Sequence, residues 1–197
     1  MPNTVQPENL DAVKRAYRAE VRERRRNIST SQRASWAQTL TENLQQLVQA
    51  EQCSKVSCYL PTLDEPDTRA FVRWAHDYGI HVLLPISRED GLLDWVASDG
   101  TETEPGLYGI DEPVGAILSP MAVNEVDLML IPASGVDAVG NRTGWGRGYF
   151  DKTLGSMDNR PLVFAVIFDD EFVDALPADL HDQPVDGVVT PSRIHRF

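Results

Sequence analysis

The chain of 197 residues is long enough to form one domain with a substantial core. Its formal net charge of −12 argues against general binding to nucleic acid or to membrane surfaces. It has no apolar stretch long enough to span a membrane, no apolar segment near its start that is typical of a secretory signal, and only two cysteines, Cys53 and Cys58. We therefore expect a cytoplasmic protein with reduced cysteines and with neither a nucleic-acid nor a membrane partner.

Residues 1–8 are expected to form a flexible tail, and residues 9–197 a single domain. From Leu10 to about Ile28 the pattern predicts a helix, with a basic side chain at every fourth position along one stripe. These side chains are Lys14, Arg18, Arg22 and Arg26. In most helices such a stripe is a solvated face. Residues 1–26, however, hold seven Lys or Arg against four Asp or Glu, a net charge of +3, whereas residues 27–197 carry −15. The helix is thus one of two places where this acidic chain could hold an anion.

A second helix is predicted from a cap at Ser29, Thr30 or Ser31 to about Ala50, and its apolar face makes it a scaffold element. Six apolar runs have the length and composition of strands. They are Lys55–Leu60, His81–Pro85, Leu92–Ala97, Leu128–Ile131, Leu162–Phe168 and Val185–Thr190. Because strands alternate with helical segments, we expect a mainly parallel sheet with helices on both faces.

The segment after the first expected strand, Pro61 to Thr68 (PTLDEPDT), is restricted by two prolines and rich in acidic and hydroxyl side chains. Asp67 or Thr68 can cap a helix that continues to Tyr78. Taken as structure alone, the segment is an ordinary loop between a strand and a helix. In an open α/β sheet, however, ligands bind beyond the carboxyl ends of the strands, which is where this loop would lie.

The strand expected at Leu128–Ile131 leads into a loop with five glycines and then into a helix expected from Tyr149 to Met157. The glycines are Gly135, Gly140, Gly144, Gly146 and Gly148. A strand, a glycine-rich loop and a helix start direct backbone N–H groups at one point, where an anion can bind. Arg142, Arg147 and Lys152 lie in or beside the loop. The pattern therefore favours a polyphosphate site over a plain turn-rich connection.

Two common phosphate-binding patterns do not fit this loop. The P-loop needs a glycine five positions before its Gly-Lys-Ser/Thr, and counting from Gly140 places Trp145 where the second glycine belongs. The dinucleotide fingerprint G-x-G-x-x-G fits at Gly144 and Gly146, but the third glycine, Gly148, comes one residue early. A dinucleotide-dependent oxidoreductase is therefore disfavoured.

Residues 140–151, GNRTGWGRGYFD, resemble the signature of the 5-formyltetrahydrofolate cyclo-ligases (5,10-methenyltetrahydrofolate synthetases), which is usually close to G-x-R-L-G-x-G-x-G-Y-Y-D. The sequence departs from it at Thr143, where leucine is common, and at Phe150, where a second tyrosine is usual. Further stretches match patterns of the family in the family's order. They are Lys14 with Arg18; Tyr59, Pro61, Glu65, Asp67 and Thr68, with Pro66 as a departure; the turn Leu107–Pro113; and His181, Asp182, Asp186 and Thr190.

The resemblance extends from Lys14 to Thr190 and implies a single-domain, three-layer α/β/α fold. It also implies a set of site residues. ATP would be bound by Lys14, Arg18, Arg142, Thr143, Gly144, Trp145, Gly146, Arg147, Gly148, Tyr149 and Phe150. The folate substrate would be bound by Leu60, Glu65, Trp145, Gly146, Arg147, Gly148 and Tyr149, with Glu65 at the pterin ring. Arg147 and Tyr149 would act in catalysis, and Asp151 and Asp186 would hold Mg2+.

The activity that the resemblance implies is the ATP- and Mg2+-dependent conversion of 5-formyltetrahydrofolate to 5,10-methenyltetrahydrofolate, with release of ADP and phosphate. Phosphorylation of the formyl oxygen would be followed by attack of N10 of the same molecule. The expected partners are therefore two small molecules, ATP and 5-formyltetrahydrofolate. The alternative is a protein of the same fold that binds a nucleotide or a folate without turnover, in a regulatory or storage role.

Overall fold

The structure, a computed structural model, describes residues 7–157, 159–179 and 182–197. The helices in these ranges are α1 (Pro7–Arg26), α2 (Thr30–Ala50), α3 (Arg69–Asp77) and α4 (Tyr149–Gly155), and none of them is long and apolar enough to cross a membrane. Short 3-10 helices lie at Leu107–Gly109, Pro120–Glu125 and Asp169–Glu171. Residues 1–6 of the expected tail and His181 lie outside the described residues, whereas Pro7 and Glu8 already belong to α1.

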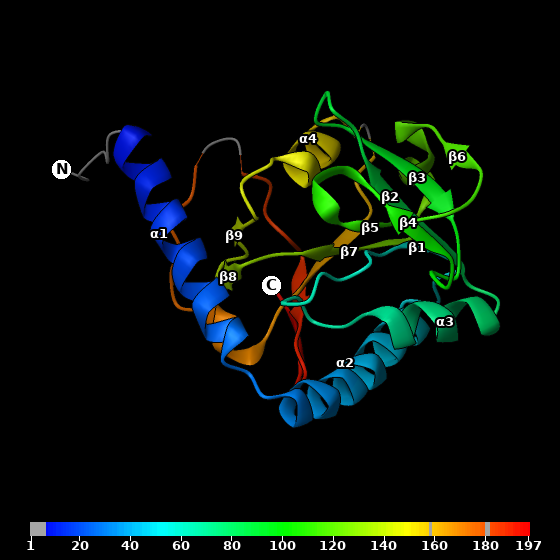
Figure 1. Cartoon of the computed structure of the whole chain (residues 1–197), viewed down its shortest axis with the longest axis horizontal. Coiled ribbons are helices and arrows are strands. Elements are labelled where there is room, and N and C mark those ends of the chain that lie inside the picture. Colours follow the sequence, from blue (N-terminus) through cyan, green and yellow to red (C-terminus); the bar gives the residue numbers. More distant parts are fainter. Residues whose placement is uncertain (1–6, 158, 180–181) are drawn as a thin grey trace.

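An eight-stranded sheet runs through the middle of the molecule (Figure 1). In spatial order its strands are β13 (Ile194–Arg196), β12 (Gly187–Val189), β10 (Leu162–Val166), β7 (Leu128–Pro132), β1 (Lys55–Ser57), β2 (His81–Ser87), β3 (Leu93–Ala97) and β6 (Ile117–Leu118). The strands from β12 to β2 are parallel to one another, whereas β13, β3 and β6 add antiparallel edges. The expected mainly parallel sheet is therefore confirmed.

Helices cover both faces of this sheet. In β7, Leu128 and Leu130 belong to the hydrophobic cluster between the sheet and helices α2 and α3. Met129 and Ile131 belong to the cluster between the sheet and α4. This division follows from the period of two residues in a strand, which sends successive side chains to opposite faces. All four side chains are buried, which is why the strand reads as a continuous apolar run. The three-layer α/β/α fold is confirmed, with α2 and α3 below the sheet and α4 above it in Figure 1.

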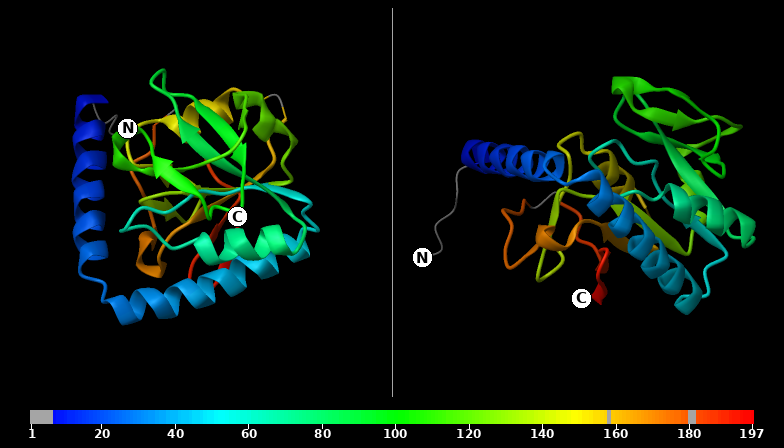
Figure 2. Two further views of the ribbon diagram at one scale, coloured as in Figure 1. Left: turned by 45° about the vertical axis from the view of Figure 1, so that its right-hand side comes forward. Right: turned by 60° about the horizontal axis from the view of Figure 1, so that its bottom comes forward.

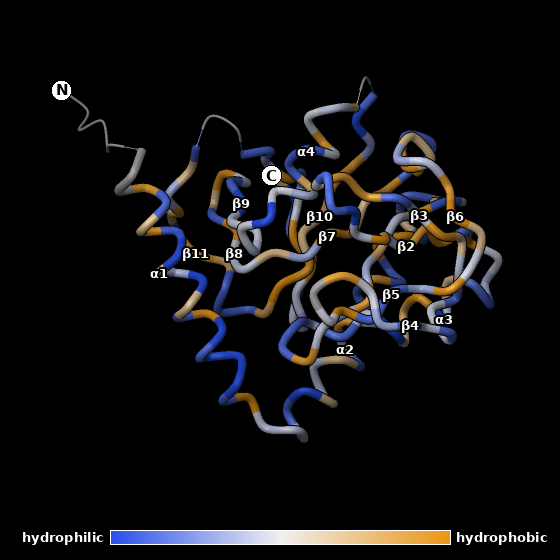
Figure 3. The backbone as a smooth tube through the Cα atoms, turned by 45° about the horizontal axis from the view of Figure 1, so that its top comes forward, coloured by the Kyte–Doolittle hydropathy of each residue, from blue (hydrophilic) through white to orange (hydrophobic). Residues whose placement is uncertain are grey.

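Helix α1 lies apart from these layers, at the margin of the molecule beside β8 and β9 (Figures 1 and 2). Among the described residues, neither hydrophobic cluster of the core includes a residue of α1. In Figure 3 the tube of α1 is mostly blue, whereas β7 and β10 are largely orange. The helix is therefore attached to the rest of the chain by something other than a shared apolar core.

The chain leaves the sheet after β1 earlier than its apolar run predicts. β1 ends at Ser57, although Cys58, Tyr59 and Leu60 are still buried. The hydroxyl of Thr68 donates to the carbonyl oxygen of Tyr59 at 2.6 Å, so this oxygen is bonded to the loop and not to a neighbouring strand. The segment from Tyr59 to Thr68 therefore turns over the carboxyl end of the sheet.

Two small sheets, which the sequence pattern does not predict, order the loops at this edge. β11 (Phe172–Val173), β8 (Gly135–Asp137) and β9 (Arg142–Thr143) form one of them, and β4 (Thr103–Pro105) and β5 (Asp111–Pro113) form the other. β8 and β9 are an antiparallel pair within the glycine-rich loop. Asp137 closes their turn, because its Oδ1 accepts the backbone N–H groups of Val139 and Asn141 at 3.1 and 2.9 Å. The first half of the loop is thus a fixed hairpin.

Candidate active site

Two hollows adjoin at the carboxyl edge of the sheet, and the glycine-rich loop is the wall between them. The larger is a cavity of about 330 Å³ that reaches from the ends of β1, β2 and β7 to the loop. The smaller, of about 180 Å³, lies between the loop, α1 and the segment around Asp182. Gly144, Gly148 and Asp151 line both hollows. Ligands in the two hollows would therefore lie next to one another at this short segment.

Glycine is needed at position 146 of this wall for two reasons. Its φ angle is +93°, in the region that side chains of L residues rarely adopt. A Cβ atom there would also lie 3.1 Å from the guanidinium of Arg18. The loop can therefore pass close to Arg18 of α1 only because residue 146 has no side chain.

Two cations of α1 reach the smaller hollow. The ammonium of Lys14, which is only 6% exposed, forms an ion pair with Asp182 in which Nζ and Oδ2 are 2.5 Å apart. Nε of Arg18 donates to the carbonyl oxygen of Gly144 at 2.7 Å, and partial burial lowers the pKa of Arg18. Arg18 stays charged at neutral pH, because the ordinary pKa of arginine is far above 7. The helical spacing of four residues thus places two positive charges at one hollow.

Arg142 is positioned differently from these two cations. Its guanidinium is 3% exposed and forms an ion pair with Asp151 at the start of α4. Burial lowers the pKa of Arg142, and the negative charge of Asp151 acts in the opposite direction. Arg142 therefore holds the carboxylate of Asp151 in place, and it lines the larger cavity, not the smaller hollow.

Polar atoms without partners gather in the same loop. Nε of Arg142, Oγ1 of Thr143 and Nε1 of Trp145 are buried, and among the described residues they have no hydrogen-bond partner. Buried polar groups in native proteins are almost always bonded to protein, water or ligand. Three unpartnered groups within four residues are typical of a segment that completes its hydrogen bonds with a ligand.

The larger cavity has an acidic side formed by two loops. Thr62 donates its backbone N–H and its hydroxyl to Oε2 of Glu65, at 2.9 and 3.0 Å, which fixes the carboxylate at the cavity wall. Glu112 also lines the cavity; its side chain is 8% exposed and accepts the backbone N–H of Ser87 at 2.8 Å. The sequence pattern assigns no chemistry to Glu112, although the turn that contains it resembles the family's pattern.

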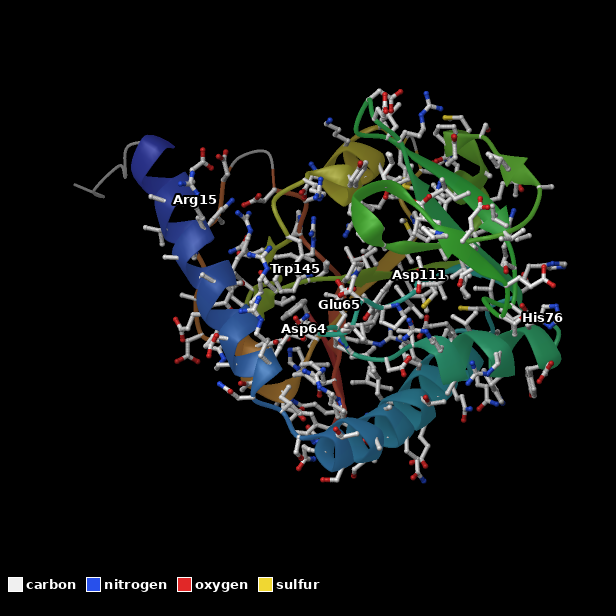
Figure 4. The ribbon with its side chains drawn as sticks, viewed as in Figure 1. Arg15, Asp64, Glu65, His76, Asp111 and Trp145 are labelled. Carbon is white, nitrogen blue, oxygen red and sulfur yellow. The ribbon has the colours of Figure 1, made fainter. Side chains whose placement is uncertain are left out.

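The structure brings nearly all of the expected site residues to these two hollows. Those at the larger cavity are Leu60, Glu65, Arg142, Gly144, Trp145, Arg147, Gly148, Tyr149, Phe150 and Asp151. Those at the smaller hollow are Lys14, Arg18, Thr143, Gly144, Gly146, Gly148 and Asp151. Figure 4 shows Trp145 beside α1, with Glu65 and Asp64 next to it between α1 and the sheet. The hydroxyl of Tyr149 donates to the carbonyl oxygen of Arg88 at 2.9 Å, so its ring is held at the wall of the cavity.

Asp186 is not brought to this site. It precedes β12 and is level with Val163 near the start of β10, so it lies at the amino end of the parallel strands. Its carboxylate accepts the backbone N–H of Val163 at 2.8 Å and pairs with Arg160 at 3.2 Å. The expected pair of Asp151 and Asp186 is therefore not formed in this structure. The carboxylates that share the smaller hollow with Asp151 are those of Asp11, Asp179 and Asp182, and Asp182 is the one that lies in the same motif as Asp186.

A glycine-rich wall between a hollow lined by two cations and several carboxylates and a partly acidic cavity, at the carboxyl edge of a parallel sheet, is typical of α/β enzymes that hold two ligands side by side. The chain matches the model of the 5-formyltetrahydrofolate cyclo-ligase family over residues 11–191. The chain therefore belongs to this family, as its motifs indicate, and is an enzyme of that class.

Individual relatives agree with this assignment. The chain is 34% identical over 143 residues to the 5-formyltetrahydrofolate cyclo-ligase of Mycolicibacterium smegmatis, which covers 70% of this chain and 74% of the relative. It is 26% identical over 191 residues to the enzyme of the same name from Mus musculus, covering 91% and 94% of the two chains. The solved structure of 5,10-methenyltetrahydrofolate synthetase from Aquifex aeolicus matches with a TM-score of 0.78 and 27% identity, over 93% of this chain and 92% of that one.

Proposed function

We propose that the protein converts 5-formyltetrahydrofolate and ATP into 5,10-methenyltetrahydrofolate, ADP and phosphate. The observation that carries this proposal is that the two hollows adjoin at Gly144, Gly148 and Asp151, so that a nucleotide in the smaller hollow and a folate in the larger cavity would be in contact there. We also expect the enzyme to act in the cytoplasm, where its two buried cysteines would stay reduced.

The reaction needs ATP because a formamide carbonyl is a poor electrophile, since its nitrogen donates electrons into it. The formyl oxygen would attack the γ-phosphorus, forming an O–P bond while the bond to ADP breaks. N10 would then attack the formyl carbon of the resulting imidoyl phosphate. The C–O bond breaks, phosphate leaves with the electron pair, and the N10 proton passes to solvent or phosphate. The protein has little covalent chemistry to do beyond positioning the reactants and neutralising charge.

The smaller hollow is the proposed nucleotide site. Lys14 and Arg18 would bind phosphate oxygens, and Lys14 would then exchange its pair with Asp182 for a pair with phosphate. The backbone of Thr143, Gly146 and Gly148 would approach the same phosphates, because glycines allow close contact. Each charged hydrogen bond of this kind contributes on the order of 1.5–3 kcal/mol.

The larger cavity is the proposed folate site. Glu65 would accept N–H groups of the pterin ring, as a carboxylate can accept two such bonds at once. Leu60 lies close by and would contact the ring through its apolar side chain. Arg147 and Tyr149, next to the wall, are the proposed catalytic residues. The guanidinium of Arg147 would stabilise the charge of the phosphoryl group in transfer, and Tyr149 would hold the formyl group against the wall.

Magnesium would be bound by carboxylates of the smaller hollow. Among the described residues, no three His, Cys, Asp or Glu side chains converge as a ready-made metal site. Mg2+ is commonly held by one or two carboxylates together with phosphate and water oxygens, and Asp151 and Asp182 fit that requirement. We propose these two residues as ligands, with Asp182 in place of Asp186. The ion would neutralise charge on the phosphate oxygens.

The two departures from the family signature do not favour the non-catalytic alternative. Phe150 packs against the hydrophobic cluster beneath α4, so a phenyl ring serves there without a hydroxyl. Thr143 is buried at the smaller hollow, and its unpartnered hydroxyl could bond to a phosphate. Neither residue replaces a charged group, and the charged side chains of the signature are all present.

The activity is tested by mixing the purified protein with 5-formyltetrahydrofolate and following absorbance in the band of the methenyl product. We expect a rise that requires ATP and Mg2+ and that is matched by an equal amount of released ADP. Binding of both ligands without any absorbance rise would instead support the non-catalytic alternative.

The metal ligands are tested by three matched substitutions. Asp151→Asn and Asp182→Asn should each lower turnover at least tenfold and raise the Mg2+ concentration that half-saturates it, because each removes a negatively charged ligand. Asp186→Asn is the control: it should lower the melting temperature, since it weakens the contacts with Arg160 and Val163, and leave the Mg2+ dependence unchanged. An altered Mg2+ requirement in Asp186→Asn alone would reverse our assignment.

A further inference from the structure

Arg22, on α1, lines the larger cavity and is exposed there. The next three arginines of the helix all pair with carboxylates: Arg24 with Glu20, Arg25 with Glu171, and Arg26 with Glu23. Among the described residues, Arg22 forms no ion pair. The protein has 30 Asp and Glu against 18 Lys and Arg, so carboxylates are abundant. Arg22 lines a cavity and has no carboxylate partner among the described residues. It is therefore available to bind a carboxylate of a ligand.

The guanidinium of Arg22 is also held in position. It lies over the indole ring of Trp145, 5.1 Å from the ring centroid. The guanidinium of Arg25 lies 4.8 Å from the same centroid and is fixed by two hydrogen bonds to Glu171, of 2.6 and 2.8 Å. Stacking on an aromatic face leaves the N–H groups in the guanidinium plane able to bind a carboxylate. Because the side chain is already ordered, binding would cost less side-chain entropy.

The cavity carries both acidic groups and a cation. One side carries Asp64, Glu65 and Glu112, which suit a ligand head that is rich in N–H groups. Arg22 of α1 and Trp145 also line the cavity, and in Figure 4 Trp145 lies beside α1, with Glu65 farther from α1 toward the sheet. A ligand with an N–H-rich head, an aromatic middle and a carboxylate end has a partner for each of these groups.

We propose that Arg22 binds a carboxylate of the glutamyl tail of the folate and so determines specificity for that tail. This inference rests on the proposed function, because it takes the pterin ring to lie at Glu65. Arginine can bind a carboxylate through two parallel N–H bonds, which gives a geometric as well as an electrostatic preference. Arg22 acts in binding only, since the tail is remote from the formyl group that reacts.

The test compares two substrates in two variants. The substrates are 5-formyltetrahydrofolate and a neutral analogue in which a methylamide replaces the glutamyl residue. For Arg22→Gln, kcat/KM for the natural substrate should fall about ten- to a hundredfold, mainly through KM, as expected for the loss of a charged hydrogen bond. For the neutral analogue, the wild type and Arg22→Gln should have equal kcat/KM. Arg15→Gln is the matched control, because Arg15 is an exposed arginine of the same helix that does not line the cavity.

Each other outcome overturns the inference. An equal loss for both substrates would mean that Arg22 shapes the cavity through Trp145 and does not bind the tail. A loss of the same size in Arg15→Gln would mean that the general positive potential of α1 attracts the substrate. Failure of the wild type to bind or convert either substrate would reject the proposed function, and the role of Arg22 with it. Normal conversion by the wild type and by Arg22→Gln would reject the role of Arg22 alone.

Discussion

Helices α1 and α2 follow one another in the chain and have nearly equal lengths, of 20 and 21 residues, yet different forces hold them. α2 buries Leu40, Leu44, Leu47 and Val48 in the main hydrophobic cluster. Among the described side chains of α1, the buried ones are those of Lys14, Val21 and Arg25, and the cations bond across to Asp182 and to Glu171. α2 is thus docked by apolar burial and α1 mainly by its cations.

The way in which each helix is attached limits the role that it can have. Apolar contacts are non-directional and depend on buried area, so the buried face of α2 supports the sheet. Ion pairs can be exchanged, and the partner of Lys14 can be replaced by a phosphate. α1 is itself divided: the pair of Arg25 and Glu171, both 1% exposed, is closed to ligands, whereas Lys14 and Arg18 face the smaller hollow. The end of α1 near Arg25 anchors the helix, and its middle is the part that we propose to bind phosphate.

The largest expected effect comes from the anchor. Arg25→Met leaves Glu171 buried without its partner, which should lower the free energy of unfolding by about 3–5 kcal/mol. Urea denaturation measures this change. The double variant Arg25→Met/Glu171→Leu should recover part of the loss, because it removes the uncompensated charge. If Arg25→Met is no less stable than the wild type, α1 is not anchored through this pair.

Leu44→Ala tests the apolar docking of α2. Leu44 is 0% exposed, and removing its side chain should cost about 2–5 kcal/mol of stability. At a temperature where the variant is folded, its KM for ATP should equal that of the wild type, because α2 contributes nothing to the smaller hollow. A large change in nucleotide affinity would contradict the division between the two helices.

Lys14→Ala and Arg18→Ala test the binding part of α1. Each should raise the KM for ATP by about ten- to a hundredfold and change the KM for the folate far less, because a charged hydrogen bond to phosphate is lost. Thermal melting without nucleotide should change by only a few degrees. Arg15→Ala, on the same helix but outside both hollows, is the control. Unchanged ATP affinity in both variants would make the stripe a solvated face.

Glu65→Gln tests the larger cavity, on the other side of the glycine-rich loop from Lys14 and Arg18. It keeps the shape of the side chain but turns one acceptor into a donor, so the KM for 5-formyltetrahydrofolate should rise about tenfold or more. Nucleotide binding, measured by calorimetry without folate, should be unchanged. A parallel loss of ATP binding would show that the two hollows are not separate sites.

Much of this arrangement can be predicted from the sequence, because local patterns determine it. The run at Leu128–Ile131, a cap at Ser29, Thr30 or Ser31 and the spacing of Lys14 and Arg18 each reflect geometry within one element. The hydroxyl of Ser29 accepts the N–H of Gln32 at 3.2 Å, as a helix cap should. The glycine spacing likewise predicts a loop that approaches a ligand.

Other features depend on contacts between distant segments and could not be predicted. Arg22 and Arg25 look alike in the sequence, and only the rotation of α1 against the loop buries one and exposes the other. Asp182 and Asp186 are four residues apart, and the motif that contains both does not say which of them faces the glycine-rich loop. The path of the chain into β12 takes Asp186 to the amino end of the strands and leaves Asp182 at the smaller hollow.

The central claim is that the glycine-rich wall brings the γ-phosphate of ATP to the formyl oxygen of the folate. The most direct test uses 5-formyltetrahydrofolate labelled with oxygen-18 in the formyl group, followed by mass spectrometry of the phosphate released. The proposed reaction predicts one labelled oxygen in each phosphate, because the formyl oxygen leaves bonded to phosphorus. Unlabelled phosphate, with the label in water, would contradict the claim.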